Sequence, residues 1–600
     1  MKNKNKVEAG PRLKFHLFAE RGYDIVERTT KDLNVLNTKV HDHPEVSVSD
    51  LIQWHIPIEP NRNSTDLKVF SRMSLGFSKT TPTIVLEQNE FLYVIDPPGG
   101  IEMYDGCSLM SYALARDIWA KHGGEGPVPS AVQGRIGGAK GLWLVDYSGA
   151  FPNVSGRQYW IQISQDQLKI KPHPRDRPDA DECQRTFEVL KFTGECKQAH
   201  LNLQLITILE DRGVPRKALR ALLEADTQTY SESLKAAMRD SKALRLWMQD
   251  YGLASRSEAR RLLGSFPIEH REQAKLLLEH GFDPQDCARL KDLAYAFLSD
   301  YMTNYVEKLW ISVPCSTVVF CAPDPLNVLE EGEVCINFSS PITDPRKDYP
   351  ETMLDGLHVL VARNPAYLAS DMQLRKAVYK HELRHYKNGI LFPVKGTKPL
   401  ASLLSGGDYD GDTVTVIWDP TIVGDFTNTM PPDLPSESQC GMMQESRPLS
   451  SIFDGIRSPE EAMRVFLRGC ISFNARPSLM GVCSSEHEKL VYSLSQRRDG
   501  GKLSDEGAIM LAALAGYLVD SNKQGWKLTR EAFYSLRRNA SGRNRLPEPG
   551  FKNDTAPRKI SGTFANIIDY LKFEVAERCK SGPWQTLENS VSTLAFTKVS

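Results

Sequence analysis

The chain has 600 residues, of which 41% are apolar and 25% are charged, a composition that predicts several folded domains and excludes a disordered chain. Lys plus Arg number 74 against 75 Asp plus Glu, a formal net charge of −1, so any nucleic-acid site must be a local basic patch. The 11 cysteines include no C-x-x-C pair, and no stretch has the apolar pattern of a signal peptide or a membrane span. We therefore expect an intracellular protein, nuclear or cytoplasmic, with reduced thiols and no membrane partner.

The N-terminal segment, residues 1–95, has a mixed α/β pattern. Apolar and β-branched runs at 50–57 and 83–87 indicate strands, whereas 67–81 begins as a helix and ends on threonines. Taken alone, this helix is an ordinary amphipathic one.

The block 96–180 contains the motif Gln-Gly-Arg-x-Gly-Gly-x-Lys-Gly at 133–141, next to an apolar strand pattern. Glycines let the backbone come close to an anion, and Arg135 and Lys140 supply positive charge there. A glycine-rich turn with solvated bases is the alternative interpretation.

Residues 181–312 repeat apolar side chains at three- and four-residue spacing, which predicts helices at 199–215, 219–237 and 256–263. Gly213 followed by Pro215 indicates a helix end. We interpret this region as a helical connector whose side chains serve packing rather than chemistry.

The next region, 313–425, begins with strand patterns at 317–321 and 357–362, the second of which leads into Arg363, Asn364 and Pro365. Residues 381–385 spell His-Glu-Leu-Arg-His, the H-E-x-x-H pattern of zinc metalloproteases. A catalytic zinc requires a third protein ligand, and neither His nor Glu occurs between Tyr386 and Asp408. A metalloprotease is therefore the weaker alternative.

The most specific motif is Gly-Gly-Asp-Tyr-Asp-Gly-Asp at 406–412, followed by a β-branched strand pattern. Asp408, Asp410 and Asp412 stand at every second position, so an extended or tightly looped backbone points them to one side. Three crowded carboxylates repel one another unless a cation lies between them. Mg²⁺ prefers oxygen ligands and substrate phosphates, so we expect a Mg²⁺ site, with Mn²⁺ as the alternative ion.

Three other interpretations of this loop are weaker. An EF-hand needs Gly and Glu where the sequence has Thr413 and Asp419. A D-x-D-G-T phosphatase needs an apolar strand before its first Asp, and residues 400–407 form a poor one. A solvated acidic turn is the third alternative, although this order of glycines and acids is unusual for a simple turn.

The C-terminal region, 426–600, opens with a loop rich in Pro, Ser and Met and continues with helical patterns at 460–467, 486–495 and 505–520. A helix end on Lys523 and Gly525 is indicated. The segment 527–545 is locally basic and has aromatic neighbours, which suits an RNA backbone. A solvated helix face explains it equally well.

The acidic loop resembles the signature of the eukaryotic cellular RNA-dependent RNA polymerases of RNA silencing, and it is similar to the Asn-Ala-Asp-Phe-Asp-Gly-Asp loop of multisubunit RNA polymerases. Further motifs resemble that family in its order, from about 65 to 580: the helix and threonines at 67–81, the motif at 133–141, Arg363 before Pro365, and Val-Asp-x-x-Lys-x-Gly at 519–525. The resemblance implies an α+β fold with two double-psi β-barrels, at 96–180 and 313–425. They would be joined by the helical connector 181–312, between an N-terminal α/β segment, 1–95, and a mainly helical C-terminal region, 426–600.

The resemblance also implies roles for individual side chains. The three aspartates would hold a Mg²⁺ that activates the RNA 3′-hydroxyl, with a second Mg²⁺ arriving with the nucleotide. Lys140 and Lys169 would face the triphosphate, although the Arg and Pro that the family carries before Lys169 are Ser164 and Gln165 here. The remaining nucleotide-binding candidates are Arg363, Arg135 and Gln133.

The implied activity is the copying of single-stranded RNA into double-stranded RNA from ribonucleoside triphosphates, with helicase and nuclease proteins of silencing as suggested partners. A catalytically silent RNA-binding or scaffold relative is the alternative. The chain is short for this family, and a fragment without an N-terminal domain and a reduced form of the family are the two alternatives.

Overall fold

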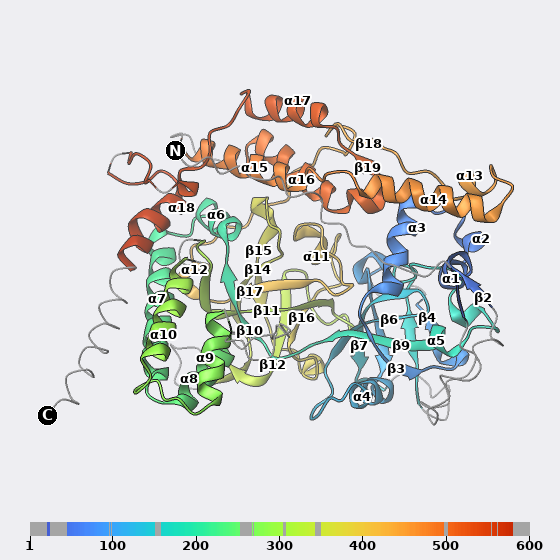
Figure 1. Ribbon diagram of the computed structural model, residues 1–600, viewed down its shortest axis with the longest axis horizontal. Helices are drawn as coiled ribbons and strands as arrows, with labels where there is room; N and C mark the ends of the chain where they lie inside the picture. Colours follow the sequence, from blue (N-terminus) through green and yellow to red (C-terminus); the bar gives the residue numbers. More distant parts are fainter. Residues whose placement is uncertain are drawn as a thin grey trace.

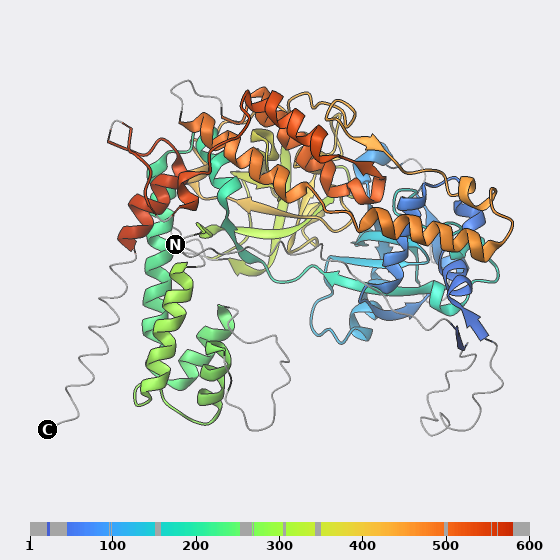
Figure 2. The same ribbon diagram turned by 45° about the horizontal axis from the view of Figure 1, so that its top comes forward.

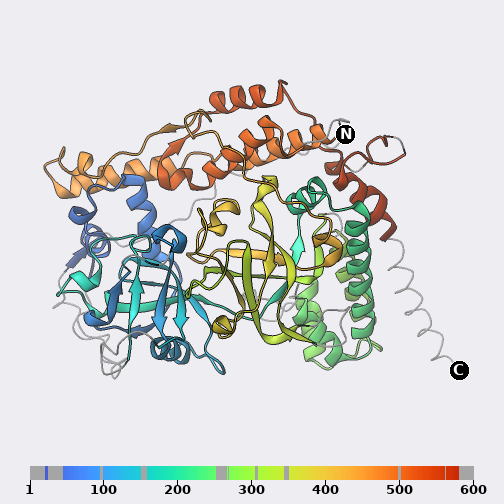
Figure 3. The same ribbon diagram turned by 180° about the vertical axis from the view of Figure 1, so that it is seen from behind.

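The computed structural model describes residues 21–23, 45–94, 97, 99–149, 158–251, 267, 269–303, 308–342, 350–496, 502–553, 555–560 and 562–579. The fold is mixed α+β, with two sheets lying side by side (Figure 1). A bundle of helices stands at the far end of the second sheet, and a layer of C-terminal helices runs across both sheets, as the view from behind also shows (Figure 3). Among the described residues, no helix combines the length and apolar character that crossing a bilayer requires.

The first sheet has the strand order β3-β9-β6-β7-β5-β8-β4. Its central strands, β6 and β7, form an antiparallel hairpin in which Arg135 faces Lys140, and the chain turns between them through Gly137 and Gly138 at positive φ. Helix α4 packs against this sheet over a core built around Trp143. The strands are β3 (Thr81–Val85), β4 (Phe91–Tyr93), β5 (Cys107–Ser111), β6 (Ala131–Ile136), β7 (Ala139–Asp146), β8 (Ile161–Ile163) and β9 (Thr186–Phe192); the helix is α4 (Tyr112–Lys121).

The second sheet follows the order β10-β11-β16-β12-β15-β14-β17, with β13 attached to β12. Strand β17 pairs with β14 on one side and with β11 on the other, so the pairing returns to the long strand near which it began. The strands are β10 (Lys197–Leu201), β11 (Ile311–Pro323), β12 (Glu333–Ile342), β13 (Glu351–Met353), β14 (Leu357–Ala362), β15 (Met372–Ala377), β16 (Gly389–Phe392) and β17 (Thr413–Ile417).

Most of the remaining helices form two groups, and all of these except α14 contribute to one large apolar core. The first group stands beside the second sheet: α6 (Leu203–Asp211), α7 (Arg216–Ala237), α8 (Ser241–Asp250), α9 (His270–Glu279) and α10 (Ala288–Tyr301). The second group comprises the C-terminal helices α14 (Pro459–Asn474), α15 (Met480–Ser495), α16 (Glu506–Gln524), α17 (Arg530–Ser541) and α18 (Ile567–Tyr570). As predicted, α16 ends where Gly525 adopts a left-handed φ of 78°.

Three N-terminal helices, α1 (Val48–His55), α2 (Ile58–Asn61) and α3 (Asp66–Met73), connect the first sheet with the C-terminal layer. Leu67 and Met73 of α3 share an apolar cluster with Ile170 and with Phe466 of α14. Helix α3 also packs against α16. The remaining short elements are β1 (Arg21–Tyr23), β2 (Glu45–Ser47), α5 (Glu182–Arg185), α11 (Leu400–Leu403), α12 (Pro420–Val423), α13 (Ser450–Phe453), β18 (Met443–Gln444) and β19 (Trp526–Lys527).

Two secondary-structure predictions are wrong. Residues 50–57 are mostly helical rather than a strand, because Ser47 and Asp50 form a reciprocal capping box and Ile52 and Ile56 are buried one turn apart. Residues 199–201 belong to β10, which pairs with β11, so two strands precede the connector helices. The helix predicted at 256–263 lies outside the described residues.

Candidate active site

The acidic loop lies between α11 and β17, and its backbone is held from both sides. Ser405 and Gly406 adopt positive φ values of 54° and 64°. The Ser405 N–H donates to a carboxylate oxygen of Asp371 at 3.2 Å, and the other oxygen of Asp371 accepts two backbone N–H groups at 2.8 Å each. The buried Tyr409 donates its N–H to the Asp105 carbonyl at 2.8 Å. The loop is therefore anchored before any ligand binds.

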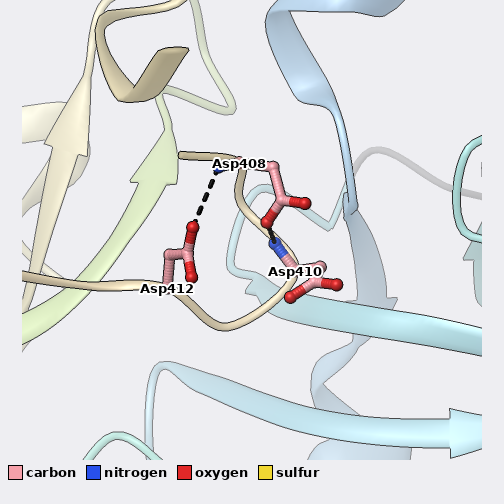
Figure 4. A group of neighbouring side chains, drawn as sticks. All are labelled: Asp408, Asp410 and Asp412. Carbon is pink, nitrogen blue, oxygen red and sulfur yellow. Dashed lines mark hydrogen bonds between the residues drawn. The ribbon is translucent and has the colours of Figure 1, made fainter. Parts of the chain in front are cut away.

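The three carboxylates converge, as predicted. One oxygen from each of Asp408, Asp410 and Asp412 lies within 4.8 Å of the others, and in the described part of the chain this is the only such group of three acids, histidines or cysteines. The Asp408 N–H donates to Asp412 Oδ2 and the Asp410 N–H donates to Asp408 Oδ1, each at 3.0 Å (Figure 4). Burial, followed by the charge of Asp410, raises the pKa of Asp408 to about 6. The negative charges of the three carboxylates repel one another, and a divalent cation that prefers oxygen ligands would relieve that repulsion.

Residues of the first sheet contact this loop directly. Lys140 Nζ lies 2.6 Å from Asp410 Oδ2, and Gln133 Nε2 donates to the Asp410 carbonyl at 3.0 Å. The fit is close: a Cβ on Gly411, where φ is 126°, would lie 1.9 Å from Gln133 Nε2, and a Cβ on Gly106 would lie 2.7 Å from the Asp410 Cβ. Glycine at these two positions lets the sheets approach each other at the acidic loop.

Arg363, at the end of β14, positions the last acid of the loop. Its Nε lies 2.9 Å from Asp412 Oδ2, and its Nη1 donates to the Ser405 carbonyl at 3.1 Å. A Cβ on Gly407 would lie 2.7 Å from the Arg363 side chain. Arg363 thus fixes both the acid and the turn that precedes it.

Arg135 does not join the acidic loop. It is buried, burial lowers its pKa, and it donates to the Leu75 carbonyl and to Ser78 Oγ just after α3. Gln133 and Arg135 stand two residues apart on β6, so the alternation of side chains would place both on one face of the strand. Only Gln133 reaches the loop, so alternation does not fully explain the placement of Arg135. Arg135 therefore holds the segment that follows α3.

Lys169 lies in a group of cations beside the loop whose other members were given no role from the sequence, and we call it the cation cluster: Lys68, Arg72, Lys169 and Lys523. Partial desolvation of the exposed Lys68 side chain, then the charges of Arg72, Lys523 and Lys169, lower its pKa. In the described part of the chain, neither Lys68 nor Arg72 has an acidic partner. Their i, i+4 spacing in a helix that the sequence predicts is the signal that could have found them, because it places both on one face.

Asp105 connects this cluster with the acidic loop. Burial, then Asp166, raises the pKa of Asp105, while Lys169 and Lys523 act in the opposite direction and Asp410 adds to the rise. Lys169 itself donates to the Asp166 carbonyl at 2.5 Å. The three aspartates of the acidic loop thus lie near the four bases of the cation cluster, which come from α3, α16 and the segment after β8.

The two decoy motifs have other structural roles. His381 and Glu382 lie in a 3₁₀ turn (His381–Leu383), and the ring of His385 packs 5.2 Å from that of Tyr147. The H-E-x-x-H residues belong to no group of three metal-binding side chains among the described residues. The residues after Asp412 form strand β17, which excludes an EF-hand loop.

Comparisons with known proteins agree on one family. A family model described as RNA dependent RNA polymerase matches residues 16–575. RNA-dependent RNA polymerase 1 of Schizosaccharomyces pombe is 25% identical over 76% of this chain and 35% of its own length, and RNA-dependent RNA polymerase 2 of Arabidopsis thaliana is 26% identical over 80% and 38%. The solved structure of the RNA dependent RNA polymerase QDE-1 from Thielavia terrestris has 34% sequence identity and a TM-score of 0.79, covering 92% of this chain and 59% of that chain. The chain thus spans little more than a third of these two curated relatives.

Proposed function

The chain belongs to the RNA-dependent RNA polymerase family, and we propose that it joins ribonucleoside triphosphates on a single-stranded RNA template to make double-stranded RNA for RNA silencing. One observation carries the proposal: the acidic loop of the second sheet meets Lys140 of the first at 2.6 Å, with the cation cluster beside them. Acids that hold a metal, set against bases that hold phosphates, are what phosphoryl transfer needs. Helicase and nuclease proteins of silencing are the partners that fit such a product.

We propose that each sheet, with its loops, is a double-psi β-barrel, at 96–180 and 313–425. The ring of pairings β11-β16-β12-β15-β14-β17-β11 supports a closed second barrel. The N-terminal segment 1–95, the connector 181–312 and the C-terminal region 426–600 complete the proposed division. Strands β9 and β10 refine the connector, since they extend the two sheets before its first helix.

The proposed metal ligands are Asp408, Asp410 and Asp412, and the ion is Mg²⁺ or Mn²⁺. Such an ion, when bound, lowers the pKa of a coordinated hydroxyl and neutralises phosphate charge. The backbone hydrogen bonds within the loop orient two of the three carboxylates. Arg363 and Gln133 hold the loop in place, so little reorganisation is needed when substrate arrives.

The proposed phosphate-binding groups are Lys140, Lys169 and the other members of the cation cluster. Lys68 and Arg72 have no acidic partner among the described residues, whereas Lys523 Nζ lies 3.9 Å from Asp520 Oδ1. Unpaired positive charge stabilises a triphosphate more effectively than charge already neutralised. Lys140 is paired with Asp410, so a metal ion on the acids would release it toward the nucleotide. Arg363 is in addition a candidate for the sugar of the incoming nucleotide, and Arg135 supports the site through the segment after α3.

Incorporation of a labelled nucleotide on single-stranded RNA, with and without Mg²⁺, tests the proposal. We expect Asp410→Ala to abolish incorporation without lowering the unfolding temperature, because removing one of three crowded carboxylates relieves the repulsion that Asp410 exerts on Asp408, which offsets the loss of the ion pair with Lys140. Incorporation by this variant would contradict the assignment. Wild-type protein that binds RNA but incorporates nothing would favour the scaffold alternative.

A further inference from the structure

A groove of about 190 Å³ lies at the C-terminal end of α16, and we call it the Trp526 groove. Leu518, Ser521 and Asn522 form one wall, because residues three and four apart share a helix face. Trp526 of β19 and Pro477, in the turn between α14 and α15, also line it. In Figure 2, α14 and α16 follow one another along the exposed face of the C-terminal layer.

Three cations line this groove: Arg476, Lys527 and Arg530. Glu445 fixes two of them, since its carboxylate lies 2.5 Å from Arg476 Nη1 and 2.6 Å from Lys527 Nζ. The Arg476 guanidinium also lies 4.9 Å from the ring centroid of Phe473. Arg530 is exposed and has no acidic partner among the described residues. With one acid against three bases, the groove keeps a positive charge.

Trp526 gives the groove an aromatic surface. Part of its ring packs against the large apolar core, and the rest is exposed in the groove. An aromatic face beside fixed cations is the combination with which proteins bind unpaired nucleotides, the base stacking and the cations tracking phosphates. The groove is smaller than the roughly 300 Å³ of a pocket for a drug-sized ligand, which suits a single base.

The groove and the cation cluster occupy neighbouring faces of the same helical turn, because Asn522 lines the groove and Lys523 belongs to the cluster. Lys523 acts on Asp105, which in turn interacts with Asp410. Helix α3, which carries Lys68 and Arg72, packs against α16, so α16 links the cation cluster with the Trp526 groove. We propose that the Trp526 groove binds one unpaired nucleotide of an RNA strand that extends from the acidic loop. The direction of the strand rests on the proposed function, whereas the binding chemistry does not.

Fluorescence anisotropy with a labelled single-stranded RNA on the order of ten nucleotides long tests the proposal. We expect Trp526→Ala to weaken binding about tenfold, because the loss of one stacked base has that order of effect. Trp526→Phe keeps an aromatic face and should retain most of the affinity. Arg530→Ala should weaken binding and flatten its dependence on salt concentration.

Matched controls separate stacking from loss of structure. Trp310→Ala removes another exposed tryptophan, 52% exposed at the start of β11, and Lys242→Ala removes an exposed cation of α8; neither should change the affinity. Arg530 is exposed, so its variant tests the groove even if Trp526→Ala unfolds. RNA affinity unchanged in both the Trp526 and Arg530 variants overturns the proposal.

Two further arms identify the occupant. Duplex RNA of the same length should bind without dependence on Trp526, because its bases offer no free face. Adenosine triphosphate should not displace the RNA; a nucleotide affinity that falls in the Trp526 variant while RNA affinity holds would overturn the proposal in favour of a free-nucleotide site. RNA binding needs no turnover, so the two proposals can fail separately. If the wild-type protein incorporates no nucleotide but its RNA affinity depends on Trp526, only the polymerase function is contradicted. If the protein incorporates nucleotides but its affinity for RNA does not depend on Trp526, only the proposal for the Trp526 groove is contradicted.

Discussion

At the scale of single residues, the site depends on glycines that bring backbone and side chains unusually close. Gly411→Ala would place a Cβ 1.9 Å from Gln133 Nε2, at a φ of 126° that L-residues rarely adopt. We expect nucleotide incorporation to fall by about 100-fold or more, because small displacements of reacting groups have effects of that size. Incorporation measured beside the unfolding temperature distinguishes displacement from unfolding.

Gly406→Ala is the matched control for that change. Gly406 also has positive φ, 64°, but its Cβ would meet nothing within 4 Å. The Gly406→Ala substitution should lower the free energy of unfolding by roughly 1 kcal/mol and leave the rate of nucleotide incorporation unchanged. Equal activity in the two variants would show that the approach of Gln133 to the loop is unimportant.

The sequence predicted the placement of those side chains whose positions follow from the local pattern. The spacing of Asp408, Asp410 and Asp412 predicted that their carboxylates would gather, and the geometry confirms it. The family suggested by this loop is likewise confirmed by the match over residues 16–575. Arg135 shows the limit: it belongs to the same motif as Lys140, yet its partners, Leu75 and Ser78, are set by packing between distant segments that no local pattern records.

At the scale of elements, α3 brings two cations to the site, Lys68 and Arg72, that no sequence motif had indicated. Lys68→Glu should raise the KM for ribonucleoside triphosphates by about tenfold, since one charge-assisted contact to phosphate has that order of effect. Stability should change little, because Lys68 is exposed. Steady-state kinetics with varied nucleotide concentration measures it, with the exposed Lys121→Glu of α4 as the control. An unchanged KM would remove α3 from the proposed phosphate site.

The segment that carries Lys169 should be sensitive to acid through His173. This side chain is buried, and burial lowers its pKa to about 4 from 6.5. Between these values the unfolded chain binds more protons than the folded one, so stability is complete above pH 6.5 and falls as the pH drops toward 4, by at most about 3 kcal/mol.

His173→Asn tests this dependence, because asparagine keeps an acceptor for the Arg175 N–H, which now donates to His173 Nδ1 at 3.2 Å, and does not titrate. The unfolding temperature of the variant should fall less than that of wild-type protein as the pH is lowered from neutral to mildly acidic values. Parallel curves for the two proteins would contradict the role of His173.

Elements were predicted best where a long pattern was undisturbed. The helices α14, α15 and α16 and the strands β11 and β14 lie where apolar periodicity placed them. The segment 50–57 failed because a capping box at its start decides in favour of helix over a β-like composition. The segment 199–201 failed because its pairing partner, β11, lies more than a hundred residues away in sequence.

At the scale of the whole molecule, a bound divalent ion should stabilise the joined sheets. Ligands that bind only the folded state add about 2.7 kcal/mol at 100 times their dissociation constant, so Mg²⁺ or Mn²⁺ should raise the unfolding temperature. Replacing Asp408, Asp410 and Asp412 together by Asn should abolish that rise while sparing the fold. A rise that persists in the triple variant would place the ion elsewhere, and thermal scans across metal concentrations distinguish the outcomes.

The two sheets are tied by residues 193–196, which run directly from β9 to β10. The three aspartates of the acidic loop follow this tether in the chain, whereas Lys68, Arg72, Lys140 and Lys169 precede it, so neither half holds the complete proposed set of reacting groups. If the chain were cut within residues 193–196 and the two pieces were expressed separately, we expect neither piece alone to be active. The proposed RNA synthesis should appear only when the two pieces are combined. The proposed activity would therefore report how correctly the two halves are assembled.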